Sequence, residues 1–408
     1  MTNLPQGWEV KTLSEIGEII TGSTPSKSNV EFYGKDYPFF KPSDFEQGYF
    51  LENAGDNLSK LGFGKARQLP PKTILVVCIG SLGKVALTRV IGSCNQQINA
   101  IIPHKNIISE YIYYYCISSK FQSILFSKAP QTTLAIFNKT EFSKLEIIYP
   151  KDIKEQERIV GILDENFAKI DENIKILEQD LLNLDELMQS ALQKAFNPLK
   201  DNAKENYKLP QGWEWKSLGE IANTSSGGTP SRNKKEYWEN GNIKWLKSGE
   251  LNDGYIDFIE ENITEEAIKN SSAKIFQKGT LLIAMYGATA GKLGILNLDS
   301  TTNQAICAFL HKDKNIKFLE KFLFYFLFFL RDKIIKDSFG GAQPNINQTY
   351  IKNLQIPLPP IKEQEQIASH LDELSSHVKN LKQNYQAQIK DLQELKNSLL
   401  DKAFKGNL

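Results

Sequence analysis

The chain has 408 residues, of which 41% are apolar and 24% are charged, and its formal net charge is +1. The length suggests two to four domains, and the composition fits a soluble globular chain with real hydrophobic cores. The small positive excess lies in two large segments, residues 1–150 and 207–358. Such a mild excess is weak evidence for nucleic-acid binding, whose usual footprint is a clustered basic face.

The sequence argues against export, membrane insertion and metal binding, so we expect a cytoplasmic protein. The polar N-terminus has no signal-peptide core, and the apolar run at 322–330 is far short of the roughly 20 residues of a membrane span. This run is expected to form a buried helix. The four histidines are too scattered for a metal site. The cysteines show no Cys-x-x-Cys spacing and are expected to be free thiols: Cys78, Cys94, Cys116 and Cys307.

The chain repeats itself. The segment LPQGWE occurs at 4–9 and 209–214, and TPS occurs at 24–26 and 229–231. The segment IKEQE occurs at 153–157 and 361–365, and KAF occurs at 194–196 and 402–404. The chain is therefore two diverged copies of one unit, and it suits a target that also comes in two parts.

Each copy has the same order of elements, a mixed segment followed by a long helix. In residues 1–150, a strand is predicted at 73–77 and a helix at 111–126, because of their β-branched and apolar runs. Residues 151–206 hold a long helix that ends before Asn197-Pro198, followed by a polar linker. Residues 207–358 repeat the mixed pattern, with a strand at 280–284 and a helix at 316–336. Residues 359–408 hold the second long helix.

Both long helices carry an apolar heptad seam, which predicts a coiled coil. The first seam consists of Leu163, Phe167, Ile170, Ile174, Leu177, Leu181, Leu184, Met188, Ala191 and Ala195. The second consists of Leu371, Leu374, Val378, Leu381, Tyr385, Ile389, Leu392, Leu395 and Leu399. It is more polar, with Ser375, Lys382 and Lys396 at positions where the first has Phe167, Ile174 and Met188. Each helix is about 60 Å long at about 1.5 Å per residue, so its stripe needs a partner, either the other helix or another protein.

Several motifs resemble catalytic signatures without matching them. The turn at 286–292, which ends in Lys292, is one residue short of a phosphate-binding loop, and Leu293 stands where that loop has Ser or Thr. Its sister turn at 80–85, which contains Lys84, is shorter still. Both turns are better interpreted as tight turns that present a lysine. No metal-nuclease cluster and no methyl-donor loop is present, so no catalytic residue is predicted.

Polar loop residues recur in both copies. Lysine suits phosphates, whereas Ser, Thr, Asn and Gln suit phosphates and base edges. Each single residue has an equally plausible role as a turn or cap residue, but their joint recurrence favours a DNA-binding face in each copy. With the two turn lysines, the candidates in the first copy are Thr24, Ser26, Lys41, Lys84, Asn95, Gln96, Gln131 and Thr132. Those in the second copy are Thr229, Ser231, Lys247, Lys292, Asn303, Gln304, Gln343 and Asn345.

The repeated LPQGWE, G-x-TPS and IKEQE segments, together with two mixed segments and two long helices, closely resemble the specificity (S) subunit of type I restriction–modification systems. The resemblance covers the whole chain. It implies an α+β protein with two target recognition domains, at 1–150 and 207–358. They are separated by two long antiparallel coiled-coil helices with an internal pseudo-twofold repeat. Each domain would read one half of a bipartite double-stranded DNA site, and the candidate loop residues are the ones that match the family's repeated motifs.

The resemblance also implies partners. The helices would set the spacer and dock two modification (methyltransferase) subunits, and restriction (translocase and nuclease) subunits would join the complex. S-adenosylmethionine, ATP and magnesium are expected on those partners, with no cofactor and no metal on this chain. The assembled complex would be an adenine-N6 DNA methyltransferase and an ATP-dependent endonuclease, to which this chain contributes no chemistry. The recognised sequence is not implied.

Two other functions compete with this interpretation. A structural tether that binds proteins would explain the long helices but not the paired polar loops. An independent nuclease would need a metal cluster, which the sequence does not offer.

Overall fold

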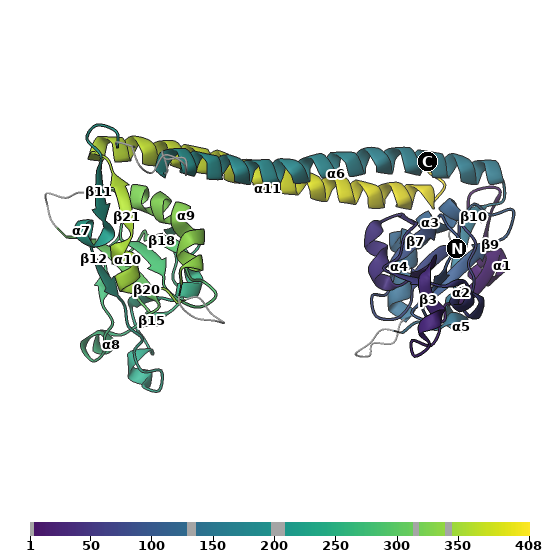
Figure 1. Cartoon of the computed structure of the whole chain (residues 1–408), viewed down its shortest axis with the longest axis horizontal. Coiled ribbons are helices and arrows are strands. Elements are labelled where there is room, and N and C mark those ends of the chain that lie inside the picture. The colour runs from purple at the N-terminus through teal and green to yellow at the C-terminus, as the bar shows by residue number, and fades with distance from the viewer. Residues whose placement is uncertain (1–3, 129–135, 197–208, 313–317, 339–344) are drawn as a thin grey trace. The chain divides into compact units, whose positions relative to one another are not determined.

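The computed structural model describes all residues except 1–3, 129–135, 197–208, 313–317 and 339–344. Its internal contacts divide the chain into two units, Met1–Glu178 with Tyr385–Leu408, and Gln179–Asn384. Each unit contains one mixed α/β domain and a stretch of each of two long helices, α6 (Ile153–Phe196) and α11 (Ile361–Ala403) (Figure 1). The predicted fold class and the internal repeat are thereby confirmed.

The first domain is built on a five-stranded sheet with the strand order β2-β9-β6-β7-β4. A three-stranded sheet, β5-β3-β8, and a separate β1-β10 pair complete it. Its strands are β1 Trp8–Thr12, β2 Gly17–Thr21, β3 Tyr33–Phe40, β4 Phe50–Leu51, β5 Asp56–Leu58, β6 Ile74–Val77, β7 Val85–Thr88, β8 Ser93–Cys94, β9 Ile98–Pro103 and β10 Glu146–Pro150. Its α-helices are α1 Leu13–Ile16, α2 Lys60–Lys65, α3 Ser109–Ile117, α4 Ser119–Lys128 and α5 Lys139–Ser143, and its 3-10 helices are Val30–Phe32 and Pro42–Gln47.

The second domain repeats this topology. Its five-stranded sheet has the order β12-β20-β17-β18-β14, its smaller sheet has the order β15-β13-β19-β16, and β11 pairs with β21. The strands are β11 Glu214–Ser217, β12 Ala222–Ser226, β13 Ile243–Leu246, β14 Gly254–Ile256, β15 Asn262–Ile263, β16 Ile275–Phe276, β17 Leu281–Ala284, β18 Leu293–Leu296, β19 Ser300–Thr302, β20 Ile306–His311 and β21 Gln355–Leu358. The α-helices are α7 Leu218–Ile221, α8 Glu265–Lys269, α9 Glu320–Lys336 and α10 Gln348–Asn353, and the 3-10 helices are Lys235–Tyr237 and Ser248–Glu250.

The strands predicted at 73–77 and 280–284 are confirmed as β6 and β17, which are fully buried. The single helix predicted at 111–126 is wrong, because the segment forms two helices that meet at Ser118. Ser118 has an extended backbone, with φ −65° and ψ 150°, and its hydroxyl accepts a hydrogen bond from the Phe121 amide at 3.4 Å. A serine in this position ends one helix and caps the next. The predicted helix at 316–336 is observed from Glu320 onwards.

The repeated LPQGWE segment opens the strand that leads each copy. In the first copy, Gly7 has φ +83°, which a residue with a side chain rarely adopts, and its carbonyl accepts from the Lys151 amide at 3.0 Å. Trp8 then starts β1, which pairs antiparallel with β10. Because β10 directly precedes α6, the start of the domain is fastened to the start of the long helix. Gly212, with φ +88°, opens the equivalent β11-β21 pair.

The two long helices run antiparallel within each unit. In the first unit, Arg158 near the start of α6 donates to the carbonyl of Leu408 at 3.0 Å, while Asp171 pairs with Lys396. In the second unit, Leu192 near the end of α6 joins the same core as Leu371 near the start of α11. The two helices therefore provide the partner that each apolar seam requires.

The predicted seams are buried to different degrees. Five of the predicted residues are buried, namely Leu163, Ile170, Leu184, Leu371 and Val378. Partly buried are Phe167, Ile174, Leu177, Leu181, Leu374, Leu392 and Leu399. The assignments of Leu395 and Leu381 are wrong, because their side chains are 46% and 39% exposed. The neighbouring Lys382 instead turns toward α6 and pairs with Asp185, so this stretch of the helix interface is polar.

The cysteines and the apolar run have the surroundings that the sequence predicts. All four cysteines are free and buried. Within the described ranges, none of the helices combines the length and apolar character that crossing a membrane requires. Residues 322–327 belong to the core of the second unit, as expected for a buried helix.

Candidate nucleic-acid interface

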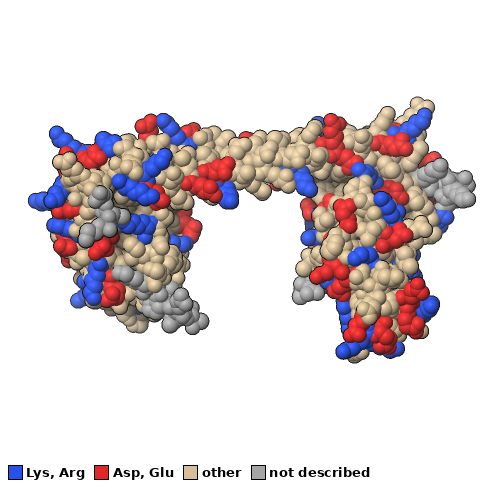
Figure 2. Space-filling view, turned by 180° about the vertical axis from the view of Figure 1, so that it is seen from behind, with Lys and Arg blue, Asp and Glu red and all other residues tan. Residues whose placement is uncertain are grey.

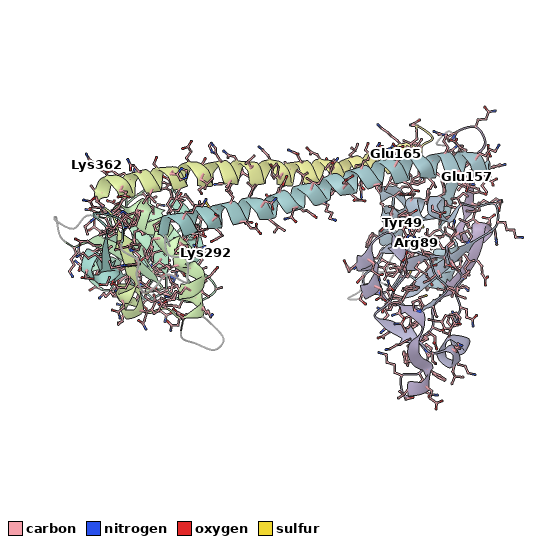
Figure 3. All side chains as sticks on the ribbon, turned by 45° about the horizontal axis from the view of Figure 1, so that its top comes forward. Tyr49, Arg89, Glu157, Glu165, Lys292 and Lys362 are labelled. Atoms are coloured by element: carbon pink, nitrogen blue, oxygen red, sulfur yellow. The ribbon has the colours of Figure 1, made fainter. Side chains whose placement is uncertain are left out.

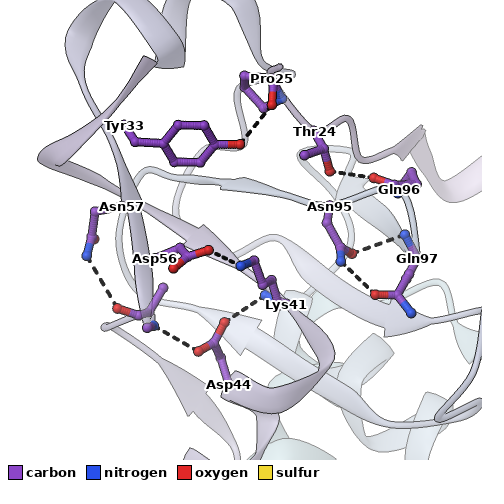
Figure 4. Close-up of polar contacts among 12 residues, drawn as sticks. Thr24, Pro25, Tyr33, Lys41, Asp44, Asp56, Asn57, Asn95, Gln96 and Gln97 are labelled. Carbon is purple, nitrogen blue, oxygen red and sulfur yellow. Dashed lines mark hydrogen bonds and ion pairs between the residues drawn. The ribbon is translucent and has the colours of Figure 1, made fainter. Parts of the chain in front are cut away.

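A threonine and a glutamine join two loops in the same way in each domain. The Thr24 hydroxyl donates to the side-chain carbonyl of Gln96, and the Thr229 hydroxyl donates to that of Gln304. In the first domain the bond joins the loop after β2 to the loop before β9 (Figure 4). In the second domain it joins the loop after β12 to the loop before β20. Four predicted residues therefore form two equivalent cross-loop pairs, and all four remain on exposed loops.

The glycines in front of these threonines allow the two loops to approach. A Cβ atom on Gly22 would lie 2.1 Å from the carbonyl oxygen of Asn95, and one on Gly227 would lie 2.0 Å from that of Thr302. No side chain fits at such distances, so glycine is required at both positions. The G-x-TPS segment is therefore a close-packed loop, and its recurrence has a structural cause beside any role in binding.

The paired lysines each meet a carboxylate at the start of the neighbouring strand or directly before it. Lys41 pairs with Asp56, and Lys247 pairs with Glu261 at 2.7 Å (Figure 4 shows the first pair). Burial, followed by repulsion from the nearby Lys27 ammonium, lowers the pKa of Lys41. In the second domain, the hydrogen bond to Glu261 raises the pKa of Lys247. The two lysines thus occupy equivalent places in different electrostatic surroundings.

The predicted asparagines act within their own loops. The Asn95 side chain accepts from the Gln97 amide at 3.0 Å, and it is only 7% exposed. The Asn303 side chain accepts from the Ala305 amide at 3.2 Å. These are hydrogen bonds of turn residues, as the alternative interpretation of the sequence anticipated. The Ser26 hydroxyl bonds with that of Ser28 at 2.7 Å, whereas Ser231 accepts through its carbonyl from the Trp238 indole at 3.1 Å.

The lysine-bearing turns differ in charge. Both turns are shaped by glycines with positive φ, at Gly83 (+88°) and Gly291 (+81°). The ammonium of Lys84 pairs with Glu46, whereas Lys292 is exposed and makes no ion pair with any described residue (Figure 3). The turn lysine of the second domain is therefore the freer cation.

Lys84 lies apart from the other predicted residues of its domain. It lines a groove of about 1010 Å³ that also contains Tyr49, Arg89 and residues from α3, α6 and the end of α11 (Figure 3 labels the first two). The structure therefore brings together Thr24, Lys41, Asn95 and Gln96, and it separates Lys84 from them. Gln131, Thr132 and Gln343 lie outside the described residues, and Asn345 forms a backbone bridge with Tyr286.

The sequence interpretation missed Arg232, which directly follows the second TPS segment. Its guanidinium lies 3.7 Å from the ring centre of Trp238 and 4.8 Å from that of Trp245, and it pairs with Glu261 at 2.6 Å. The signal available in the sequence was an arginine at the position where the first copy has Lys27. Two tryptophans in the following segment were a further signal.

Charge is mixed on the face of each unit that Figure 2 shows. On the face shown in Figure 2, Lys and Arg alternate with Asp and Glu on both units. No cluster of three or more His, Cys, Asp or Glu that could hold a metal ion occurs among the residues that the structure describes.

Duplicated loop faces on a pair of long helices define a binding protein with two recognition domains. The family described as "Type I restriction modification DNA specificity domain" matches residues 5–180 and 210–391, so the chain belongs to this family of type I restriction–modification specificity subunits and recognises DNA sequence through its two domains. The function predicted from the sequence is confirmed at this level.

Individual relatives agree. The MjaIX specificity subunit of Methanocaldococcus jannaschii is 26% identical over 99% of this chain and 94% of its own length. The HindI specificity subunit of Haemophilus influenzae is 39% identical over 44% of this chain and 40% of its own length.

Two solved structures share the fold. A chain described in a study of complex assembly and conformational transition of the type I R-M system has a TM-score of 0.81 and 21% identity, with both chains covered completely. The HsdS subunit from Thermoanaerobacter tengcongensis has a TM-score of 0.60 and 21% identity, with 99% of this chain and 98% of that one covered.

Proposed function

We propose that the first domain reads one half of a bipartite DNA site and the second domain reads the other half, while α6 and α11 set the unread spacer. The observation that carries this proposal is that both domains share the same contacts between two loops, here called the loop frame, but present different side chains on it. The Thr–Gln bonds and the close-packed glycines are shared. The residue after the TPS segment differs, being Lys27 in one domain and Arg232 in the other, and the paired lysines meet Asp56 in one domain and Glu261 in the other.

A shared frame with different side chains is what two unlike half-sites require. The Thr–Gln bond holds the same two loops together in each domain, and the residues that differ between the domains would meet different base edges. The modest net charge fits this division of labour, because specificity comes from base contacts and much of the affinity would come from partner subunits. The isolated chain is therefore expected to bind DNA weakly.

The partner subunits are also part of the proposal. Two modification subunits would dock on the long helices and carry S-adenosylmethionine for adenine-N6 methylation. Restriction subunits would bring ATP- and magnesium-dependent translocation and cleavage. This chain would position the target and contribute no group to either reaction. Supporting this proposal, apolar residues remain exposed on α6, at Ile176, Leu182 and Leu187, and on α11, at Leu381 and Leu395.

The test is to co-express the chain with a matching modification subunit in an unmodified host and to map N6-methyladenine over the genome. One split motif, with two defined halves around an unread gap, is the expected result. Exchanging the second domain for that of another specificity subunit should replace one half of the motif and retain the other. A stable complex that methylates no new motif would contradict the proposal.

A further inference from the structure

Arg232 has an orientation that is set by three neighbours. Its guanidinium stacks on Trp238, lies within 4.8 Å of the ring centre of Trp245, and contacts Glu261 at 2.6 Å. Despite these contacts, its side chain is 51% exposed. A charged group that is both clamped and open to solvent is suited to contact a ligand rather than to stabilise a core.

The two indoles that hold Arg232 are themselves fixed to the same loop. The Trp245 indole donates to the carbonyl of Gly228 at 2.9 Å, and the Trp238 indole donates to the carbonyl of Ser231 at 3.1 Å. The rings meet edge to face, with centres 5.0 Å apart and planes at 88°. Trp245 is buried, so the rigid part of the clamp is anchored in the domain.

The guanidinium keeps donors available. Arginine carries five N–H donors, and the contact of its Nη1 atom with the Glu261 carboxylate is an ion pair. The remaining donors form a planar fork. Such a fork matches two neighbouring acceptors, and in the major groove the O6 and N7 atoms of guanine form the pair that arginine contacts most often. A lysine can neutralise a phosphate but cannot reproduce this geometry.

The first domain provides an internal comparison. The β3 and β13 registers make Phe39 equivalent to Trp245, and Asp56 equivalent to Glu261. Lys27 stands after the first TPS segment, where the second copy has Arg232, and it makes no ion pair with any described residue. The first domain thus presents the point charge of a lysine without an ion-pair partner among the described residues, where the second presents an oriented fork.

We propose that Arg232 reads a guanine in the half-site of the second domain through a bidentate contact. This inference rests on the proposed function, since it assumes that the second domain meets DNA through its loop face. It adds a specificity-determining residue and the base that the residue selects. Because the fork is held before DNA arrives, little side-chain entropy is lost on binding, and a wrong base leaves its donors unpaired.

The first test is genomic. Arg232→Lys and Arg232→Ala variants of the full chain, each co-expressed with the modification subunit, should lose preference for guanine at one position of one half-site. The discrimination at that position should fall by roughly 5- to 150-fold, the range expected for one bidentate contact. The other half-site should be unchanged. Lys27→Ala is the matched control, and it should leave the guanine position intact.

The second test removes one acceptor from the DNA. Duplexes in which the chosen guanine is replaced by 7-deazaguanine lack the N7 atom, so the wild-type complex should bind them more weakly. The Arg232→Ala complex should bind both duplexes equally. Thermal unfolding of each variant checks that the domain is folded.

The outcomes separate the two proposals. A uniform loss of affinity for all sequences would mean that Arg232 contacts a phosphate, which overturns the inference. An unchanged motif with Arg232→Lys and Arg232→Ala, in a complex that still methylates a split site, would overturn it while leaving the proposed function standing. A wild-type complex that recognises no split site would contradict the proposed function itself.

Discussion

Gln156 and Gln364 make corresponding hydrogen bonds at the starts of the two long helices. Gln156 accepts from the Ile108 amide at 2.9 Å and donates to the Pro150 carbonyl at 2.9 Å. Gln364 accepts from the Leu319 amide at 2.8 Å and donates to the Pro359 carbonyl at 2.9 Å. Both side chains are at most 1% exposed. The glutamine of the repeated IKEQE segment therefore ties each long helix to the domain that precedes it.

Replacing this glutamine should destabilise the unit that contains it. In Gln156→Ala, a backbone amide and a backbone carbonyl lose buried partners, each of which costs roughly 1–3 kcal/mol. We expect the free energy of unfolding to fall by at least about 2 kcal/mol, measured by urea denaturation. The adjacent exposed residue Glu157 (Figure 3) supplies the control, because Glu157→Ala should change stability by only about 0.5 kcal/mol. Equal stabilities of the two variants would show that the buried bonds contribute nothing.

Three glycines should respond to alanine in opposite ways. Gly22→Ala and Gly227→Ala place a Cβ atom about 2 Å from a backbone oxygen, so the loops must separate, and each variant should lose several kcal/mol, on the order of the largest single-residue effects. Gly161 lies inside α6 with nothing within 4 Å of a Cβ atom. Gly161→Ala should therefore stabilise the protein by roughly 0.5–1 kcal/mol. Thermal unfolding shows directly whether each variant is more or less stable than wild type. A Gly22→Ala protein as stable as wild type would refute the close approach of the loops.

The two turn lysines should contribute unequally to DNA binding. Lys292 has no ion-pair partner among the described residues, whereas Lys84 is partly neutralised by Glu46. The turn before Lys292 is also fixed by Arg331, which donates to the Gly291 carbonyl at 3.0 Å and pairs with Asp253. Lys292→Ala should lower the salt dependence of binding, the slope of log K against log salt, by about 1.

The corresponding Lys84→Ala change should have a smaller effect on the slope. Glu46→Gln, which frees Lys84, should strengthen binding by the assembled complex. Equal slopes for wild type and Lys292→Ala would remove this turn from the DNA interface. The measurement needs only fluorescence anisotropy of one cognate duplex over a range of salt concentrations.

Glu261 should give the second domain a pH-dependent stability. Burial alone would raise the pKa of its carboxyl, but the ion pairs with Arg232 and Lys247 outweigh burial and lower the pKa below its ordinary value of 4.5. A carboxyl with a lowered pKa stabilises the fold above its ordinary pKa and loses that contribution as the pH falls through the lowered value.

At neutral pH, Glu261→Gln should therefore be less stable than wild type by about 1 kcal/mol, the upper range for ion pairs near a surface. The difference should shrink as the pH is lowered below 4.5, because wild-type Glu261 then becomes neutral as well. Urea denaturation of both proteins at several pH values measures it. A difference that grows on acidification would contradict the assigned direction.

Much of the architecture was predictable because it follows from local patterns of residue types along the sequence. Heptad spacing of apolar residues predicted the long helices, because burial of one helix face leaves a periodic pattern. Continuous β-branched runs predicted β6 and β17, because both faces of these strands are buried. The recurrence of whole segments predicted two copies of one domain. The helix at 111–126 was mispredicted because a single serine, Ser118, both ends one helix and caps the next, and this does not disturb the apolar pattern.

The candidate loop residues were predicted by type and recurrence, but their roles were not. Thr24 and Gln96 are far apart in sequence and become hydrogen-bonded only when two loops meet. The same holds for Lys41 with Asp56. Asn95 proved to support its own turn, as the alternative interpretation allowed. Leu381 fits the heptad by spacing, yet it is exposed, and it is the neighbouring Lys382 that faces α6 and pairs with Asp185.

The sequence by itself determined that the chain is duplicated, that each copy is a mixed domain followed by a long helix, and that the chain belongs with DNA specificity subunits. Repeats, capping residues and apolar periodicity are properties of the order of residues along the chain, so they can be recognised without knowledge of the fold. Only the tertiary structure decided that Arg232 is clamped by Trp238, Trp245 and Glu261, while Lys27 is not paired with any described residue. Such an arrangement depends on strands from distant parts of the chain packing side by side, and no pattern along the sequence encodes that geometry.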